Sequence, residues 1–511
     1  MAVMLPSEPH QHSVTLLEDV LPNVFSHLSQ LKGTLRSASM VCQAWYNPAM
    51  DALWSERMYL QDLLNVLSPL EKRGRKFFFT GPLTPYSWSR FHSLARRVRD
   101  ASLFNHPLDA TLVSELSRTN PNSGPLLPNV RRLWLREVRI EYSLIWMSPA
   151  IEGLNLFLET KGDTVGGERH DPVTVSDFFT RMGELCPNLL DISLGGQGIG
   201  PGSIDVATRA IGQLNSLQIV HVSSNDQSDV TAILLKMAEL PEVRELWLDC
   251  IVTFPSEWLP STVAPFPELQ KLLIKWPSTP GTIAFLHNLA AAGSQLRELE
   301  LGEDLDGEIE SMAAMIRLAG EHRQLESLTM YGRVDDEPLT IEVIAPILRC
   351  ASLITLSLDT RGELAINDGD FETIASNLPK LKHFMVTTHS DETPTLSLQA
   401  LSVAITFWPY LEHLSLEVDA RDPVPENDHM GVHKCLQELH LGASPISTDP
   451  IAAAWFIAGL SGAEEFKVSY DGHSPRSGLQ WARLVKMLPG LQASRAGGMS
   501  KVAITSSAES G

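Results

Sequence analysis

The residues best suited to chemistry are a glycine-rich run and a cluster of acids, and neither has the spacing its chemistry requires. Residues 195–202 read GGQGIGPG and follow an expected strand, but no G-x-G-x-x-G register fits, so we interpret the run as a tight turn. Asp304, Asp306 and Glu308 resemble part of a calcium loop, yet its twelfth position falls on Ala313 instead of Glu. The sequence therefore predicts neither a dinucleotide nor a calcium site.

Residue types that form nucleophilic or metal-binding sites are scattered along the chain. The 16 histidines include no H-E-x-x-H pair, and neither a G-x-S-x-G elbow nor a Walker A loop occurs. The cysteines are Cys42, Cys186, Cys250, Cys350 and Cys435. They form no C-x-x-C pair and their number is odd, which favours a reducing compartment. We expect no catalytic residue, no metal and no cofactor, and a chain that is not an enzyme.

An apolar pattern does recur, at intervals of 25 to 30 residues from Leu189 onward. It consists of an apolar residue, two variable residues, a second apolar residue, one variable residue and a third apolar residue. Residues 240–250 (LPEVRELWLDC) contain it as Val243, Leu246 and Leu248. The interval matches leucine-rich repeats. Other copies begin at Val130, Leu189, Leu217, Leu269, Leu296, Leu325, Leu353, Leu381, Leu411 and Leu436, and poorer ones at Ile151 and Ala463.

This repeat predicts a fold. The second and third apolar places are two residues apart, so on an extended strand both side chains point into the core. Between strands, residues such as Ile283, Leu286 and Leu289 have helical spacing. We expect an α/β fold in which residues 128–490 form a leucine-rich-repeat solenoid, with a parallel sheet on its concave side and helices on its convex side. The amphipathic stretch 481–488 would cap its end.

The residue between the second and third apolar places should project from the concave side, and so should the residue after the third place. Large apolar, aromatic or charged side chains there are the kind that anchor protein interfaces. Single exposed apolar residues are also ordinary, and a covering loop or tail is the alternative. The target-binding candidates are Trp134, Arg136, His221, Trp247, Leu273, Lys275, Tyr331, Met385 and His440.

Composition and charge narrow the class of partner. The 43% hydrophobic and 20% charged residues are typical of a soluble protein. No run of about 18 apolar residues occurs, and the N-terminus lacks the features of a secretion signal. Residues 71–139 carry 13 Lys and Arg against 5 acids, or +8, whereas 140–511 carry 24 against 50, or −26. We expect no nucleic-acid partner, no membrane partner, and a cytoplasmic or nuclear location.

The N-terminal region has a different, helical character. After a flexible leader, residues 1–14, apolar residues recur at helical spacing in three stretches within 15–68, the last of them over residues 50–67. These helices hold more apolar surface than so small a unit can bury alone, so they either dock on the solenoid or keep a face for another protein. Residues 69–127 are expected to be a linker and helical cap whose arginines form a solvated face. Residues 491–511 are expected to form a disordered tail.

The helical region resembles an F-box. Residues 16–28 (LLEDVLPNVFSHL), 34–45 (TLRSASMVCQAW) and 52–58 (ALWSERM) carry the resemblance, which extends over the whole chain to fungal F-box proteins with leucine-rich repeats. Two departures occur: Leu17 replaces the usual proline, and the acidic residue of the first turn is missing near Gly33. The resemblance implies a three-helix module that binds the Skp-type adaptor of SCF ubiquitin ligases and, through it, a cullin scaffold.

The same resemblance implies roles for individual residues. Trp45 and Trp54 would pack the three helices together. The residues at or beside the adaptor surface would be Leu16, Leu17, Val24, Phe25, Leu28 and Val41. The chain would then be the substrate receptor of an SCF-type E3 ligase, with an unknown protein as its target. The alternative is a stand-alone leucine-rich-repeat scaffold whose helical module only caps the first coil.

Overall fold

The structure, a computed structural model, describes residues 20–28, 31–55, 58–74, 76–103, 110–122, 124–138, 140–158, 172–196, 211–224, 234, 236–252, 265–277, 279–302, 309–332, 338–360, 362–388, 393–421, 432–463, 466–471 and 475–496. The chain divides into unit 1, Met1–Val243, and unit 2, Arg244–Gly511. The expected leader, Leu16, Leu17 and the acids at 304–308 lie outside the described residues. No helix in the described ranges is long and apolar enough to cross a membrane.

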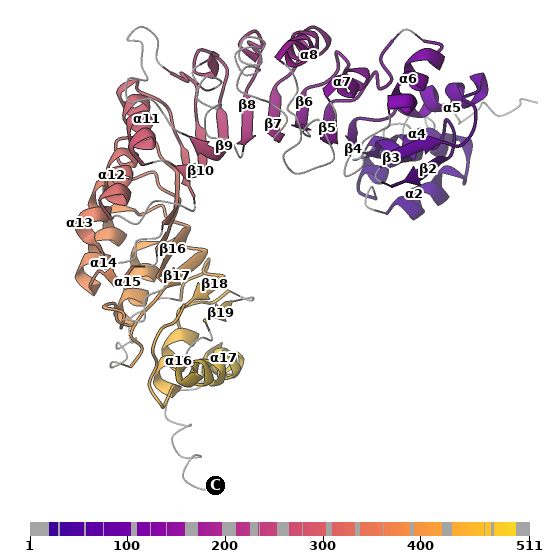
Figure 1. The fold of residues 1–511 in the computed structure, drawn as a ribbon. Coiled ribbons are helices and arrows are strands. Elements are labelled where there is room, and N and C mark those ends of the chain that lie inside the picture. Colours follow the sequence, from indigo (N-terminus) through magenta and orange to yellow (C-terminus); the bar gives the residue numbers. More distant parts are fainter. Residues whose placement is uncertain are drawn as a thin grey trace, which may run out of the picture. The chain divides into compact units, whose positions relative to one another are not determined.

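Three helices at the start of unit 1 form what we call the N-terminal module. Residues 20–26, α2 (Lys32–Ser39) and α3 (Gln43–Ser55) pack around one small core (Figure 1). Leu21 and Phe25 are four residues apart and Leu35 and Ala38 three apart, so each pair lies on one helix face, where all four are buried. The rings of Phe25 and Trp45 meet edge to face at 5.5 Å.

The single helix expected over residues 50–67 is wrong. Helix α3 ends at Ser55, and a two-residue strand, β1 (Met58–Tyr59), comes before the short α4 (Leu60–Leu64). Met58 pairs with Ala101 of β4 (Asp100–Leu103). Hydrogen bonding to a neighbouring strand therefore overrides the local helical spacing, as tertiary contacts often do.

The parallel sheet of unit 1 starts before residue 128, where the sequence places the solenoid's first strand. Its order is β1, β4, β5 (Arg132–Val138), β6 (Gly153–Leu158), β7 (Asp191–Gly196) and β8 (Ile219–Ser224). Strand β4 belongs to a further copy of the repeat, in which Val98, Ala101 and Leu103 fill the three apolar places and are buried. Alanine at the second place concealed this copy from the sequence reading.

Much of the expected linker, 69–127, is regular structure. Strands β2 (Leu70–Arg73) and β3 (Lys76–Phe79) form an antiparallel hairpin that turns at Gly74, whose φ is +62°. Helix α5 (Pro85–Ala95) is capped by Thr84, whose side chain accepts from the Ser87 N–H while the Ser87 side chain accepts from the Thr84 N–H. The other helices of unit 1 with described bounds are α6 (Ala110–Thr119), α7 (Ile140–Ser143) and α8 (Pro172–Leu185).

The strands of unit 2 are all parallel within its large sheet, and their register follows the repeat. In order they are β9 (Glu245–Val252), β10 (Lys271–Pro277), β11 (Glu298–Leu301), β12 (Ser327–Gly332), β14 (Thr355–Thr360), β16 (His383–Thr388), β17 (His413–Leu416), β18 (Glu438–His440) and β19 (Lys467–Ser469). The second apolar places of neighbouring copies lie opposite one another: Leu246, Leu272, Leu299, Leu328, Leu356, Phe384, Leu414, Leu439 and Val468. The first eight are buried.

Helices lie on one side of this sheet and leave the other side open, as Figure 1 shows for α11, α12, α14 and α15. Their bounds are α11 (Thr279–Ala291), α12 (Ile309–Ala319), α13 (Ile341–Ile344), α14 (Asp368–Asn377), α15 (Gln399–Phe407) and α16 (Ile451–Ala458). Two short strands, β13 (Leu339–Thr340) and β15 (Leu364–Ala365), pair beside them. The predicted α/β fold, a parallel sheet backed by helices, is confirmed.

A long helix, α17 (Pro475–Ala496), ends the described part of unit 2. It contains the expected cap, 481–488, where Trp481 is buried and its Nε1 donates to the carbonyl of Ser444 at 2.7 Å. The disordered tail was predicted to start at residue 491, but Leu491 is buried within this helix. Apolar residues spaced along one face, Leu484, Leu488 and Leu491, extend the helix to Ala496.

Candidate functional site

The N-terminal module exposes a group of apolar side chains that we call the module face: Val20, Val24, Met40 and Val41. Their exposed fractions are 48%, 46%, 74% and 64%. Val20 and Val24 are one helical turn apart, and Met40 and Val41 lie in the turn between α2 and α3. All four apolar side chains are thus open to solvent on a small unit, where another protein could cover them.

Two of the expected adaptor residues serve the core instead of the surface. Phe25 is 2% exposed and contacts Trp45, so its side chain is not free to touch a partner. Leu28 is partly buried against the same core. Trp45 packs there too, in the role expected for it. Of the expected adaptor residues in the described ranges, Val24 and Val41 are exposed, whereas Phe25 and Leu28 pack in or against the core.

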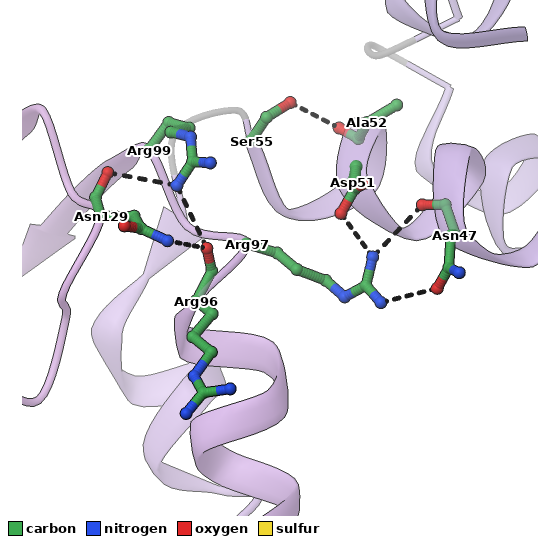
Figure 2. A network of polar contacts seen from close by, with 8 residues as sticks. All are labelled: Asn47, Asp51, Ala52, Ser55, Arg96, Arg97, Arg99 and Asn129. Carbon is green, nitrogen blue, oxygen red and sulfur yellow. Dashed lines mark hydrogen bonds and ion pairs between the residues drawn. The ribbon is translucent and has the colours of Figure 1, made fainter. Parts of the chain in front are cut away.

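A single arginine ties α3 to the turn that follows α5. Figure 2 shows Arg97 reaching α3, where its guanidinium donates to the carbonyl oxygen of Asn47 at 3.3 Å, to Asn47 Oδ1 at 2.8 Å and to the carboxylate of Asp51. Its side chain is only 19% exposed. Asn129 and Arg99 strengthen the turn through the carbonyl of Arg96. The expectation of a solvated arginine face is thus wrong for Arg97, because its guanidinium donates to three acceptor atoms on α3, from Asn47 and Asp51, and is mostly covered.

The candidates in unit 1 lie on β5 and β8, with β6 and β7 between these two strands. Trp134 and His221 belong to one cross-strand row, in which Ser193 Oγ and His221 Nδ1 are 3.2 Å apart. Arg136 lies two residues further along β5, with its guanidinium 5.4 Å from the ring centroid of Phe157. A Cβ atom at Gly195 would come within 2.5 Å of that ring. The first glycine of the run at 195–202 thus makes room for an aromatic side chain.

Four candidates in unit 2 share one row across the sheet. The register places Trp247, Leu273, Met385 and His440 opposite one another through the intervening strands. At the β9 end of this row, the Lys271 ammonium lies 5.3 Å from the Trp247 ring centroid. In the next row, Lys275 pairs with Asp249 at 3.4 Å, and Asp249 also accepts from Trp276 Nε1 at 3.2 Å. This end of unit 2 is occupied by internal pairs.

At the other end of the row, the open side of the sheet is hollowed into a groove of about 720 Å³ over β12, β14, β16, β17, β18 and β19. We call it the strand groove. Its lining includes Tyr331, Met385 and His440, three of the predicted target-binding residues. Tyr331 and Met385 are 36% and 43% exposed. The groove therefore brings together sequence candidates from three separate repeats.

Histidines and acids line the same groove. The rings of His383 and His413 stack with centroids 4.9 Å apart, and His413 Nδ1 lies 3.1 Å from Glu438 Oε2. His440 Nδ1 lies 2.9 Å from Ser469 Oγ, and its Nε2 lies 3.8 Å from Asp471. Burial and the adjacent His413 lower the pKa of His383. At neutral pH His383 is consequently uncharged.

A carboxylate at the end of β17 is held in place by neighbouring repeats. Glu417 is 6% exposed, accepts from the Thr388 hydroxyl at 2.7 Å and accepts from the Ala443 N–H at 3.1 Å. Gly442, with φ of +49°, passes so close that a Cβ atom there would lie 2.5 Å from Glu417 Oε1. The acid is fixed by two donors and a glycine, and it lines the groove.

Sequence reasoning left His383, His413, Glu438 and Asp471 out of the candidate set. The signal for the first three was present, because each occupies the place directly before the second apolar residue of its repeat. Strand alternation puts that place on the same side as the residue between the second and third apolar places. Asp471 follows β19, in the poorest copy, where the repeat gives little guidance.

Two of the cysteines are buried in the repeats. Cys186 and Cys350 are buried, and burial raises the pKa of each thiol to about 11, which keeps both protonated. Within the described ranges, no three His, Cys, Asp or Glu side chains are grouped so that they could hold a metal ion.

The described strands and helices form a leucine-rich-repeat-like solenoid, and three helices form a module at its N-terminal side. No family model and no curated protein matches the chain. Among solved structures, a chain from the Toll–Spatzle complex, described as a molecular hub in Drosophila development and innate immunity, is similar at 12% identity and a TM-score of 0.29. The match covers 75% of this chain and 59% of that one. A likeness this distant carries no argument about function.

Proposed function

We propose that the chain is a non-catalytic substrate receptor of an SCF-type ubiquitin ligase. The N-terminal module would bind a Skp-type adaptor, and the open side of the solenoid would bind a target protein. The module face supports this proposal most directly, because Val20, Val24, Met40 and Val41 stay exposed while a separate set of residues forms the core. An apolar face with its own core suits a lasting protein partner.

The mechanism of such a receptor is positional. Holding a target and an adaptor on one chain raises the effective concentration of the target's lysines near the ubiquitin-loaded enzyme. That effect requires each partner to be held firmly. The contacts of Arg97 with Asn47 and Asp51 support this part of the proposal, since they anchor α3 to the structure that leads into the sheet of unit 1.

The alternative is a stand-alone repeat scaffold whose module only covers the first coil. The same Arg97 contacts favour it, because a module that is merely a cap would also be tied down through α3. The alternative gives no reason, however, for four apolar side chains on the module to remain exposed. Adaptor binding separates the two functions.

The test compares one variant on each surface. A Val24→Asp, Val41→Asp double variant places charges on the module face without touching its core, and Met385→Asp places one in the strand groove. We expect the double variant to bind a purified Skp-type adaptor about tenfold more weakly or worse, because an apolar interface cannot pair the new carboxylates. Met385→Asp should bind it like the unmodified chain. Calorimetry measures both affinities.

Circular dichroism and hydrogen exchange over residues 20–55 establish that the variants are folded. If the folded, unmodified chain does not bind the adaptor, the receptor proposal is wrong and the scaffold alternative stands. If Met385→Asp weakens adaptor binding as much as the double variant does, the module face is not the binding surface.

A further inference from the structure

The charge of the strand groove is one-sided. Four carboxylates line it, Asp359, Glu417, Glu438 and Asp471, and none of its described lining residues is Lys or Arg. Two described lysines lie on neighbouring strand positions outside this lining: Lys382 is paired with Glu412 at 2.9 Å, and Lys467 on β19 lies opposite Glu438 in the strand register. A cationic ligand would therefore meet carboxylates and no competing fixed cation within the described lining.

One buried polar group in the groove lacks an internal partner. Ser415 lies between Met385 and His440 in the cross-strand row and is 7% exposed. Its hydroxyl has no hydrogen-bond partner. A buried hydroxyl without a partner costs free energy, and a bound group that hydrogen-bonds to it would recover part of that cost. This observation is independent of the acids and points to a ligand with hydrogen-bonding groups.

The groove also has an apolar part and a length. Tyr331 and Met385 line the groove and are exposed. They offer a contact for an apolar side chain, which the acids and Ser415 do not. Neighbouring strands lie about 4.8 Å apart, so the six strands under the groove span about 24 Å, or about seven residues of extended chain. The dimensions suit a short extended segment lying across the strands.

We propose that the strand groove binds a basic, extended segment of the target protein, about seven residues long, with Lys or Arg facing the carboxylates and an apolar side chain on Tyr331 and Met385. This inference specifies the kind of target that the chain binds, and it rests on the proposed function for the existence of such a target. Ser415 would hydrogen-bond the segment's backbone. Glu417, whose two carboxylate oxygens accept from Thr388 and Ala443, would add to the negative charge that the segment's cations meet.

The probe is a phage-displayed library of random peptides about 12 residues long, selected on the purified full chain, with the selected consensus then made as a fluorescein-labelled peptide. We expect the selected pool to be rich in Lys and Arg around an apolar residue. Raising the salt concentration should weaken binding of the labelled peptide, because part of its affinity comes from charges open to solvent.

Matched variants locate the binding site. An Asp359→Asn, Glu438→Gln, Asp471→Asn triple variant should lower peptide affinity about tenfold or more. A Glu268→Gln, Glu310→Gln, Glu372→Gln triple variant removes the same charge from exposed positions outside the groove and should have little effect. The pair separates a local carboxylate effect from the chain's overall negative charge.

Ser415→Ala gives a second signature. Removal of a hydroxyl that has no partner should leave thermal stability unchanged or raised, while peptide affinity falls about threefold to tenfold. A variant that loses affinity only by unfolding would instead lose stability.

Three results would overturn the inference: a pool without basic residues, no selectable peptide, or equal losses in the two triple variants. Adaptor binding measured on the same preparation tests the proposed function separately. Peptide binding without adaptor binding keeps the groove and removes the ligase role, and the reverse removes the groove.

Discussion

The N-terminal module offers partners an apolar surface on a small core, whereas the strand groove offers carboxylates, imidazoles and hydroxyls on a core that many repeats share. In the module, Phe25 and Trp45 meet edge to face within the core, while Val41 is exposed in the turn between α2 and α3. In the groove, Met385 and Ser415 stand on strands flanked by further strands on both sides. The module's proposed function therefore depends on a few packing contacts, while that of the groove depends on charge.

The substitution that we expect to have the greatest effect removes a side chain from the core of the module. Phe25→Ala removes a buried ring and should cost about 3–5 kcal/mol, more than so small a module can lose while staying folded. We expect residues 20–55 to lose protection in hydrogen-exchange mass spectrometry while unit 2 keeps its own. Adaptor binding should fall with it.

Leu356→Ala in β14 is the matched change in the repeated core, where the residue is 1% exposed. It should cost about 2–5 kcal/mol, yet neighbouring strands should stay protected because flanking repeats still support them. Retained protection over 20–55 in Phe25→Ala would contradict the comparison.

A pair of glycine substitutions should change stability in opposite directions in the two regions. Gly442→Ala puts a side chain at a φ of +49° and against Glu417, and should destabilise unit 2 by about 1–3 kcal/mol. Gly33→Ala, in α2 with open space around it, should stabilise the module by about 0.4–1 kcal/mol. Thermal unfolding of each variant measures both. A stabilising Gly442→Ala would mean that Glu417 can move freely, and the groove would then lack a fixed acid.

Lowering the pH should have the smallest effect of these changes, and it should alter ligand binding in the groove but not on the module face. Burial and His413 on β17 lower the pKa of His383, as does Lys382, while Glu412 opposes them, and Thr355 faces it from β14. His383 is therefore neutral above about pH 6.5, and the stability that this neutral form contributes is lost as pH falls through its lowered pKa. Protonation also adds positive charge to the groove.

We accordingly expect the affinity of the basic peptide to fall severalfold as the pH is lowered below about 6.5, and adaptor binding to change little. Fluorescence anisotropy measures the first and calorimetry the second. His383→Gln should reduce the pH dependence of peptide binding. An unchanged profile in that variant would assign the effect to other groups.

The repeat made much of the fold predictable, because three apolar places at fixed spacing define a strand, its buried side and its register. The failures have local causes. Ala101 in place of a large residue hid the strand β4, and pairing of Met58 with that strand broke an otherwise helical pattern. Trp481 and Leu491 lie in one helix that extends past the expected cap. Contacts distant in sequence decided each case.

The site was predictable as a row of positions and not as a cavity. Strand alternation placed Met385 and His440 on the open side, and the register then set them in one row. It could not show that the sheet is hollowed over six strands, nor that the Ser415 hydroxyl lacks a partner. Nor could helical spacing tell that Phe25 is buried while Val24, one residue away, is exposed.

The contacts between neighbouring repeats determine which insertions and deletions the fold tolerates. Ion pairs link residues one copy apart, as in Lys271 with Glu298 at 2.6 Å and Lys382 with Glu412 at 2.9 Å, and the strands pair through equivalent places. A duplication or deletion of one whole copy preserves the pairing of strands, whereas an insertion of a single residue within a strand would turn its apolar side chains outward. The recognition surface can thus lengthen or shorten across generations in steps of one copy.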